Sequence, residues 1–236
     1  MSYIEGFVAA VPAANKDFYL KHANTALPLI REFGASRMVE NWGDNVPEGK
    51  VTDFRRAVKA EPDEVIVFSW FTYPSREARF AANKKMIEDS RMDQFADMPF
   101  DGKRMIYGGF AVISEVGPGG PFGYVDGMLV AVPTDRKDEY LAFAKACGPL
   151  FLDYGATRLV DGWGDDVPDG KITDFRRAVQ ATAGETVVFG WVEWPSKERR
   201  DEAWPKLMAD PRMDALKPPF DGQRMVYGGF ANILDG

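Results

Sequence analysis

The chain has 236 residues, of which 45% are hydrophobic and 28% are charged, and its formal net charge at pH 7 is −7. These values fit one large domain or two small ones with a buried core, and they exclude an intrinsically disordered chain. Because lysines and arginines are interspersed with acidic residues, we expect no nucleic-acid partner and no binding to an anionic membrane surface.

The sequence also indicates the cellular compartment in which the protein is expected. Cys147 is the only cysteine, so no intrachain disulfide can form, which fits a reducing compartment. The first residues, MSYIEGFVAAVP, contain no basic residue before Glu5, so a secretory signal is not expected. The longest apolar runs are too short to span a membrane. We therefore expect a soluble, cytoplasmic protein.

One unit is present twice. The stretch NWGDNVPEGKVTDFRRAV, from Asn41, recurs as GWGDDVPDGKITDFRRAV from Gly162, 121 residues later. This long match indicates a tandem duplication of a unit with the size of one small domain. We predict a first repeat, a linker rich in Gly and Pro, and a second repeat at residues 1–113, 114–123 and 124–236.

The elements of the first repeat begin with a strand and a helix. GFVAAVP, from Gly6, is a short apolar run that ends in proline, which is typical of a buried strand. Residues 16–33 carry apolar side chains at helical spacing, with Pro28 inside the helix and Gly34 at its predicted end. SRMVENW, from Ser36, alternates as a strand does.

The repeated stretch comes next. Its Gly, Asp and Pro residues have turn chemistry, so we interpret it mainly as a shaped turn, and we predict TDFRRAV, from Thr52, as a strand. VIVFSWF predicts a strand that is buried on both faces. PSREARFAANKKMIED predicts a helix with Ser75 as its N-cap, and RMIYGGFAVI predicts a last strand with a glycine pair. The second repeat follows the same order.

This βαββαβ order is that of a ferredoxin-like α+β fold, in which helices cover one face of an antiparallel sheet. The other face would lie bare, although burial of each Phe- or Trp-sized side chain contributes roughly 1.5–3 kcal/mol. We therefore predict that the two ferredoxin-like repeats pack sheet against sheet as an intrachain pseudo-dimeric α+β barrel. Further homodimerisation of the fused chain stays open.

Three stretches, WGDDVPDGKITDF, PFDGQRMVYGGF and YVDGMLVAVP, resemble the bacterial family catalogued as domain of unknown function 1428. The resemblance covers both halves over nearly their whole length. It implies the dimeric α+β barrel superfamily, and it implies no known activity. Relatives across that superfamily include cofactor-independent monooxygenases, haem-dependent enzymes and small-molecule isomerases or dehalogenases. The resemblance places a site inside the concave face of each sheet.

Arginines in the repeated elements are candidates for ligand binding. If TDFRRAV is a strand, Arg56 points to the same side as Phe54 and Val58. A buried arginine requires a carboxylate partner or a bound anion, so a structural ion pair and a clamp for a ligand carboxylate both fit. Arg177 follows by the same parity, and Arg104 and Arg224, expected on the last strands, are similar candidates.

We expect each barrel half to hold a pocket for a small anionic or aromatic molecule. The ligand-binding candidates are Trp42, Lys50, Arg56, Arg104, Trp163, Lys171, Arg177 and Arg224. The candidates for cofactor-independent acid–base catalysis are Asp53, Tyr107, Asp174 and Tyr227.

Other chemistries are less favoured by the sequence. His22 and Cys147 are not duplicated, so no His- or Cys-based mechanism can operate in both halves. The carboxylates near the turn lack EF-hand spacing, and we expect no metal site. The competing hypothesis is a non-catalytic structural, interaction or stress-response module with a solidly packed interior. Cavity volume distinguishes the two, and whether the protein is an enzyme stays open.

Overall fold

A computed structural model describes residues 2–236. The first repeat contains β1 (Tyr3–Pro12), α1 (Lys16–Phe33), β2 (Arg37–Asn45), α2 (Phe54–Ala57), β3 (Glu64–Tyr73), α3 (Arg76–Glu88) and β4 (Ile106–Val116). The second contains β5 (Tyr124–Pro133), α4 (Lys137–Asp153), β6 (Arg158–Asp166), α5 (Phe175–Ala178), β7 (Glu185–Trp194), α6 (Lys197–Met208), α7 (Pro211–Ala215) and β8 (Val226–Asp235). Short 3-10 helices are η1 (Ala13–Asn15), η2 (Ser90–Phe95), η3 (Thr134–Arg136) and η4 (Gly222–Arg224).

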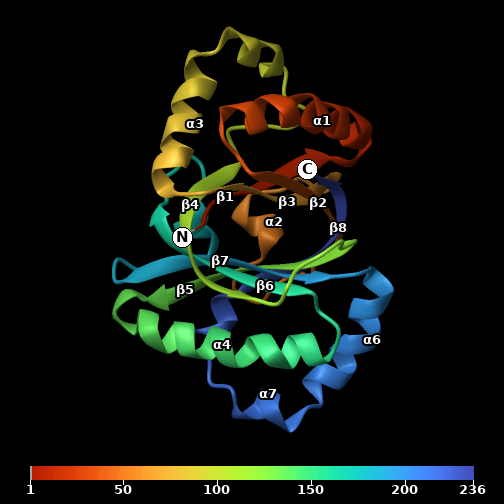
Figure 1. The fold of residues 1–236 in the computed structure, drawn as a ribbon, viewed down its shortest axis with the longest axis vertical. Coiled ribbons are helices and arrows are strands. Elements are labelled where there is room, and N and C mark those ends of the chain that lie inside the picture. Colours follow the sequence, from red (N-terminus) through yellow and green to blue (C-terminus); the bar gives the residue numbers. More distant parts are fainter. Residues whose placement is uncertain (1) are drawn as a thin grey trace.

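The eight strands form one closed barrel in the order β1-β3-β2-β8-β5-β7-β6-β4. Each repeat contributes four adjacent antiparallel strands, and the repeats meet at two seams, β2 with β8 and β4 with β6. Helices α1 and α3 cover the outer face of one sheet, and α4, α6 and α7 lie on the opposite side (Figure 1). The predicted pseudo-dimeric α+β barrel is therefore confirmed.

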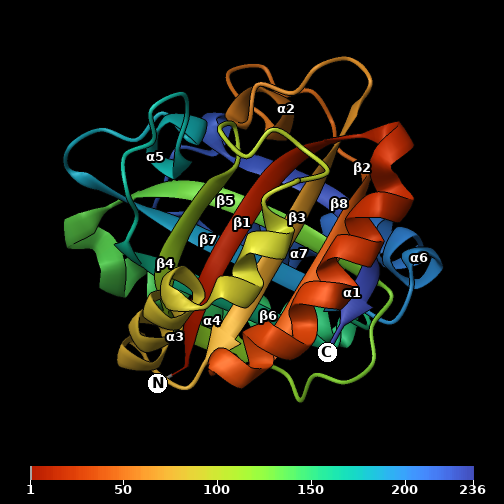
Figure 2. The ribbon, with the colours of Figure 1, turned by 90° about the horizontal axis from the view of Figure 1, so that it is seen from above.

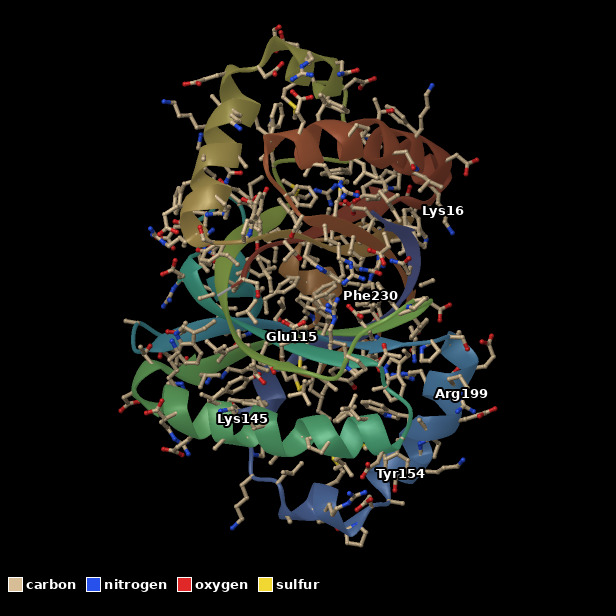
Figure 3. The ribbon with its side chains drawn as sticks, in the orientation of Figure 1. Lys16, Glu115, Lys145, Tyr154, Arg199 and Phe230 are labelled. Atoms are coloured by element: carbon tan, nitrogen blue, oxygen red, sulfur yellow. The ribbon has the colours of Figure 1, made fainter. Side chains whose placement is uncertain are left out.

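Aromatic side chains fill the inside of the barrel. Phe68 of the first repeat stacks on Phe189 of the second with ring centroids 4.4 Å apart, and Trp70 stacks on Trp191 at 4.2 Å. Phe230 lies between the two sheets, in the middle of the molecule (Figure 3). Side chains thus occupy the space in which the sequence analysis placed a ligand pocket.

The strand predicted for TDFRRAV is wrong, because this stretch forms the short helix α2. Asp53 is the N-cap of α2, and its carboxylate accepts a hydrogen bond of 2.8 Å from the backbone N–H of Arg56. That local bond outweighs the apolar alternation on which the strand prediction rested. Phe54, Ala57 and Val58 are buried, whereas the Arg56 side chain is 52% exposed. The inward orientation predicted for Arg56 and Arg177 is therefore also wrong.

The repeated stretch links the two repeats. The Thr52 hydroxyl donates to the carbonyl of Ala178 at 2.6 Å, and Thr173 donates to the carbonyl of Ala57 at the same distance. Two tyrosines form further bonds of this kind, in the pairs Tyr3–Asp165 and Tyr124–Asp44, at 2.8 and 3.0 Å. The stretch therefore shapes a turn and also holds one repeat against the other.

The connection between the repeats is shorter than predicted. Strand β4 continues to Val116, and β5 begins at Tyr124, so the irregular segment spans residues 117–123. Gly117, with φ of +100°, adopts a left-handed conformation that a side chain disfavours. Phe122 packs against the barrel core from this segment.

The predicted helix signals are present in both repeats. The Ser75 hydroxyl accepts a hydrogen bond from the N–H of Ala78, and Ser196 caps α6 in the same way. Pro28 lies inside α1, and Gly34 follows α1 with φ of +128°. Among the described residues, no helix combines the length and apolar character required to cross a membrane.

Candidate functional site

A hollow of about 490 Å³ lies between the first repeat's sheet and its helices. Alternate residues of β1, β2 and β3 form its floor, because side chains of odd and even positions point to opposite faces of a sheet. Helices α1 and α3 lie side by side over this sheet and form the roof (Figure 2). Five methionines contribute adaptable apolar walls: Met38, Met86, Met92, Met98 and Met105.

One row of side chains crosses the floor from strand to strand. Tyr107 pairs with Phe7, Phe7 with Ser69, and Ser69 with Glu40. Three inter-strand spacings separate the ends of this row, which is about 14 Å between Cα positions. The Phe7 and Phe71 rings lie 4.8 Å apart in the middle. The floor therefore has an aromatic centre, a carboxyl group at one end and a phenol at the other.

Glu40 is the most distinctive group of the hollow. Its side chain is buried, and its Oε2 accepts hydrogen bonds from the Tyr19 hydroxyl at 2.6 Å and from the Ser69 hydroxyl. Burial raises the pKa of Glu40 to about 7, against the opposing effect of these two bonds. Within residues 2–236, no hydrogen bond reaches Oε1. A proton can therefore enter or leave Glu40 near neutral pH.

The other ionisable groups around the hollow add no free positive charge. The Glu5 carboxylate binds Arg79 at 2.7 Å and Asn83 at 3.0 Å. His22 lies one turn beyond Tyr19 on α1, and burial lowers the pKa of its imidazole. None of the described lining residues is Lys or Arg. The hollow itself thus favours an uncharged group of a ligand over an anionic one.

The second repeat retains the carboxyl–tyrosine pair. The Tyr140 hydroxyl donates to Asp161 at 2.7 Å, and burial raises the pKa of Asp161 to about 6. The surrounding space differs, because larger side chains stand at three counterpart positions. Phe143, Phe151 and Trp204 replace His22, Ile30 and Asn83. Phe151 packs on Trp204 with ring centroids 6.2 Å apart, and Phe143 packs on Phe220 at 5.8 Å.

The predicted arginines bind protein groups. Arg104 pairs with both oxygens of Glu64 at 2.6 and 2.7 Å, and Arg224 pairs with Glu185 at 2.6 and 2.9 Å. Both arginines precede the last strands, although the sequence analysis placed them on those strands. Arg56 contacts Asp53 at 3.0 Å, and Arg177 contacts Asp174 in the same arrangement.

The remaining predicted residues are spread over the molecule. Trp42 and Trp163 are buried beneath the helices, packed on Tyr19 and Tyr140, so they back the carboxyl–tyrosine pairs. Asp53 and Asp174 cap short helices, whereas Lys50 and Tyr227 are exposed. Tyr107, Lys171 and Asp174 line a common depression. Ligand-binding and catalytic roles for these residues stay predictions.

Sequence reasoning missed Glu40, Tyr19 and Ser69. Glu40 has the same parity as Met38 and Trp42 in MVENW, so the alternation of a strand places its carboxyl group on the face of these two apolar residues. The duplication held a usable signal, because the tyrosine and the acid recur together 121 residues later as Tyr140 and Asp161.

The closed barrel of two helix-covered sheets defines the dimeric α+β barrel class. A solved structure named an anthrone oxidase-like protein aligns with a TM-score of 0.60 and 11% identity, over 100% of this chain and 92% of that one. A Lactobacillus acidophilus protein provisionally called a monooxygenase aligns with a TM-score of 0.57 and 11% identity, over 100% and 95% of the two chains. At these identities the likeness shows the fold alone.

The sequence defines the family. The model of the family described as "Protein of unknown function (DUF1428)" matches residues 2–102 and again residues 123–222, so the chain belongs to this family and carries its unit twice. YbaA of Escherichia coli K12, an uncharacterised protein, is 62% identical over 116 residues, which cover 49% of this chain and 99% of YbaA. A single relative thus corresponds to one repeat.

Proposed function

We propose that the hollow of the first repeat binds the uncharged, planar aromatic part of a small molecule, and that Glu40 exchanges a proton with it. The observation that carries this proposal is a buried carboxyl group with a pKa of about 7 on the floor of a hollow of about 490 Å³. A group that titrates near the working pH is suited to both accepting and donating a proton.

The shape of the floor supports a flat ligand. The Phe7 and Phe71 rings offer an apolar surface between Glu40 and Tyr107, and aromatic rings stack favourably on such a surface. The ends of the row lie about 14 Å apart between Cα positions, which is long enough for two or three fused rings. A hydroxyl or an acidic C–H group of the ligand would lie against Oε1 of Glu40.

Binding is tested by titrating the intact protein with 2-naphthol, an uncharged two-ring phenol, and following its fluorescence. We expect saturable binding that is strengthened as Glu40 ionises, because a charge-assisted hydrogen bond contributes roughly 1.5–3 kcal/mol. Glu40→Gln should weaken binding roughly tenfold above pH 7. Asp161→Asn, at the counterpart position in the second repeat, is the matched control and should leave the affinity unchanged. Equal losses of affinity in both variants would contradict the assignment of binding to the hollow of the first repeat.

Proton transfer is tested with anthrone, chosen because one structural neighbour is named for it. In D₂O a base removes a methylene proton, the anthrolate anion forms, and a deuteron returns to the same carbon. Exchange followed by NMR should be faster with wild-type protein and should fall roughly 100-fold in Glu40→Gln. A protein-independent exchange rate would leave a binding site without acid–base function.

The filled barrel favours a second candidate, a structural module with no ligand. Stacked aromatic rings from both repeats pack the barrel interior solidly. Under this hypothesis the raised pKa of Glu40 is only a consequence of burial, and neither 2-naphthol nor anthrone should bind. The 2-naphthol titration and the anthrone exchange experiment therefore distinguish a binding site from a structural module.

A further inference from the structure

A depression of about 410 Å³ adjoins the hollow, and we call it the inter-repeat groove. It is lined by residues 102–107 of the first repeat, apart from Arg104, and by residues 168–174 of the second. Met105 and Tyr107 line both the groove and the hollow, so these two side chains stand at the boundary between them. The groove therefore begins at the end of the floor opposite Glu40.

Two lysines from different repeats lie along this groove. Lys103 and Lys171 are exposed, and within residues 2–236 neither ammonium group takes part in an ion pair. Of the two acids in the lining, Asp174 caps α5 and contacts Arg177 at 3.3 Å, which leaves Asp169 as one uncommitted carboxylate. The free charges of the groove therefore sum to a net positive value.

This pair of lysines belongs to one side of the pseudo-dimer. At the position of Lys103 the second repeat carries Gln223, so the counterpart groove has a single lysine, Lys50. The side with two lysines is the side that adjoins the hollow. The acidic group, Glu40, and the basic groups, Lys103 and Lys171, thus lie at opposite ends of one continuous lining.

We propose that the inter-repeat groove binds an anionic group of the same ligand, so that the ligand is an aromatic acid with its uncharged polar end at Glu40 and its carboxylate at Lys103 and Lys171. This inference rests on the proposed function of the hollow. The division of charge would fix the direction in which the ligand enters, because a carboxylate is repelled by Glu40 and attracted by the two lysines. It also gives the second repeat a part in the first repeat's site.

The test compares two probes on the intact protein, 2-naphthol and 6-hydroxy-2-naphthoate, which carry the same hydroxyl group and differ in the carboxylate. We expect the carboxylate probe to bind roughly fivefold to tenfold more tightly at low salt, and the advantage to fade as salt screens the exposed charges. The double variant with Lys103→Met and Lys171→Met should lose this preference and keep its affinity for 2-naphthol. Lys145→Met, on α4, controls for the loss of a positive charge outside the groove. Gln223→Met controls for a methionine at the counterpart position of Lys103.

Four results overturn the inference. The carboxylate probe binds no more tightly than 2-naphthol, or the double variant keeps the preference; in both cases the proposed function of the hollow stands. If neither probe binds, the proposed function fails together with the inference. A preference that Lys145→Met removes as well would reflect net charge alone, and it would also overturn the assignment to the groove.

Discussion

The layers between sheet and helices differ between the two repeats, although both sheets have the same strand order. Both layers contain a buried acid bonded to a tyrosine, Glu40 with Tyr19 and Asp161 with Tyr140. In the first repeat this pair faces a hollow of about 490 Å³, and in the second repeat three counterpart positions carry larger aromatic side chains. The second repeat reaches the same topology with Phe151 packed on Trp204 in this layer, so the topology does not require the particular side chains that line the hollow.

The largest expected difference concerns stability. Leu207 on α6 is fully buried, whereas its counterpart Met86 on α3 borders the hollow. Leu207→Ala should lower the free energy of unfolding by about 2–5 kcal/mol, because it opens a cavity in a packed layer. Met86→Ala should cost less than about 1 kcal/mol, since it enlarges a space that already exists. Urea unfolding of both variants measures the difference, and equal costs would contradict an open first-repeat layer.

The pH dependence of stability should separate the two acids. The folded protein holds the pKa of Glu40 at about 7, above its ordinary value of 4.5, so stability falls as the pH rises from 4.5 to 7. The Glu40→Gln variant cannot ionise at this position. Its free energy of unfolding, relative to that of wild type, should therefore rise by on the order of 3 kcal/mol across this pH range.

Asp161→Asn provides the comparison. The folded-state pKa of Asp161 is about 6, above its ordinary value of 3.8. The Asp161→Asn variant should therefore gain stability relative to wild type between pH 3.8 and 6. Unfolding free energies measured in a pH series would show two displaced transitions. Wild-type-like pH profiles in both variants would mean that these carboxyl groups titrate normally.

The smallest expected effect tests whether the second repeat's side chains suffice to close the hollow. Asn83→Trp with Ile30→Phe transfers two of its aromatic residues to the first repeat. Affinity for 2-naphthol should fall by a factor of about ten, while stability is retained because the second repeat already accommodates these residues. The reverse exchange, Trp204→Asn with Phe151→Ile, is the control and should leave the first site's affinity unchanged. Unaltered binding in the plugged variant would place the ligand elsewhere.

Much of the fold followed from the sequence because it depends on long, repeated patterns. Two copies of one strand and helix order, with strands apolar on both faces, left sheet-against-sheet packing as the way to bury them. The error at TDFRRAV arose from a shorter pattern. A seven-residue alternation cannot be distinguished from a capped turn of helix when Asp53 can bond the N–H of Arg56.

The candidate site was harder to predict because the conspicuous charges have structural roles. Arg104 pairs with Glu64, and Asp53 caps a helix, so neither residue lines the hollow. At three lining positions of the hollow the side chain is smaller than its counterpart, as at Asn83 in place of tryptophan. A cavity produces no recognisable sequence motif, and it becomes apparent only from the arrangement of α1 and α3 over the sheet.

The two seams of the barrel have a consequence for synthesis. Strands β2 and β4 of the first repeat hydrogen-bond only to β8 and β6 on their outer sides, and both of those strands lie in the second repeat. At about 5–20 residues per second, a ribosome needs on the order of ten seconds to complete the second repeat. During that interval the nascent first repeat offers two unpaired edges and an aromatic face to its surroundings. Such a chain depends on chaperones, or on fast closure once its second half emerges.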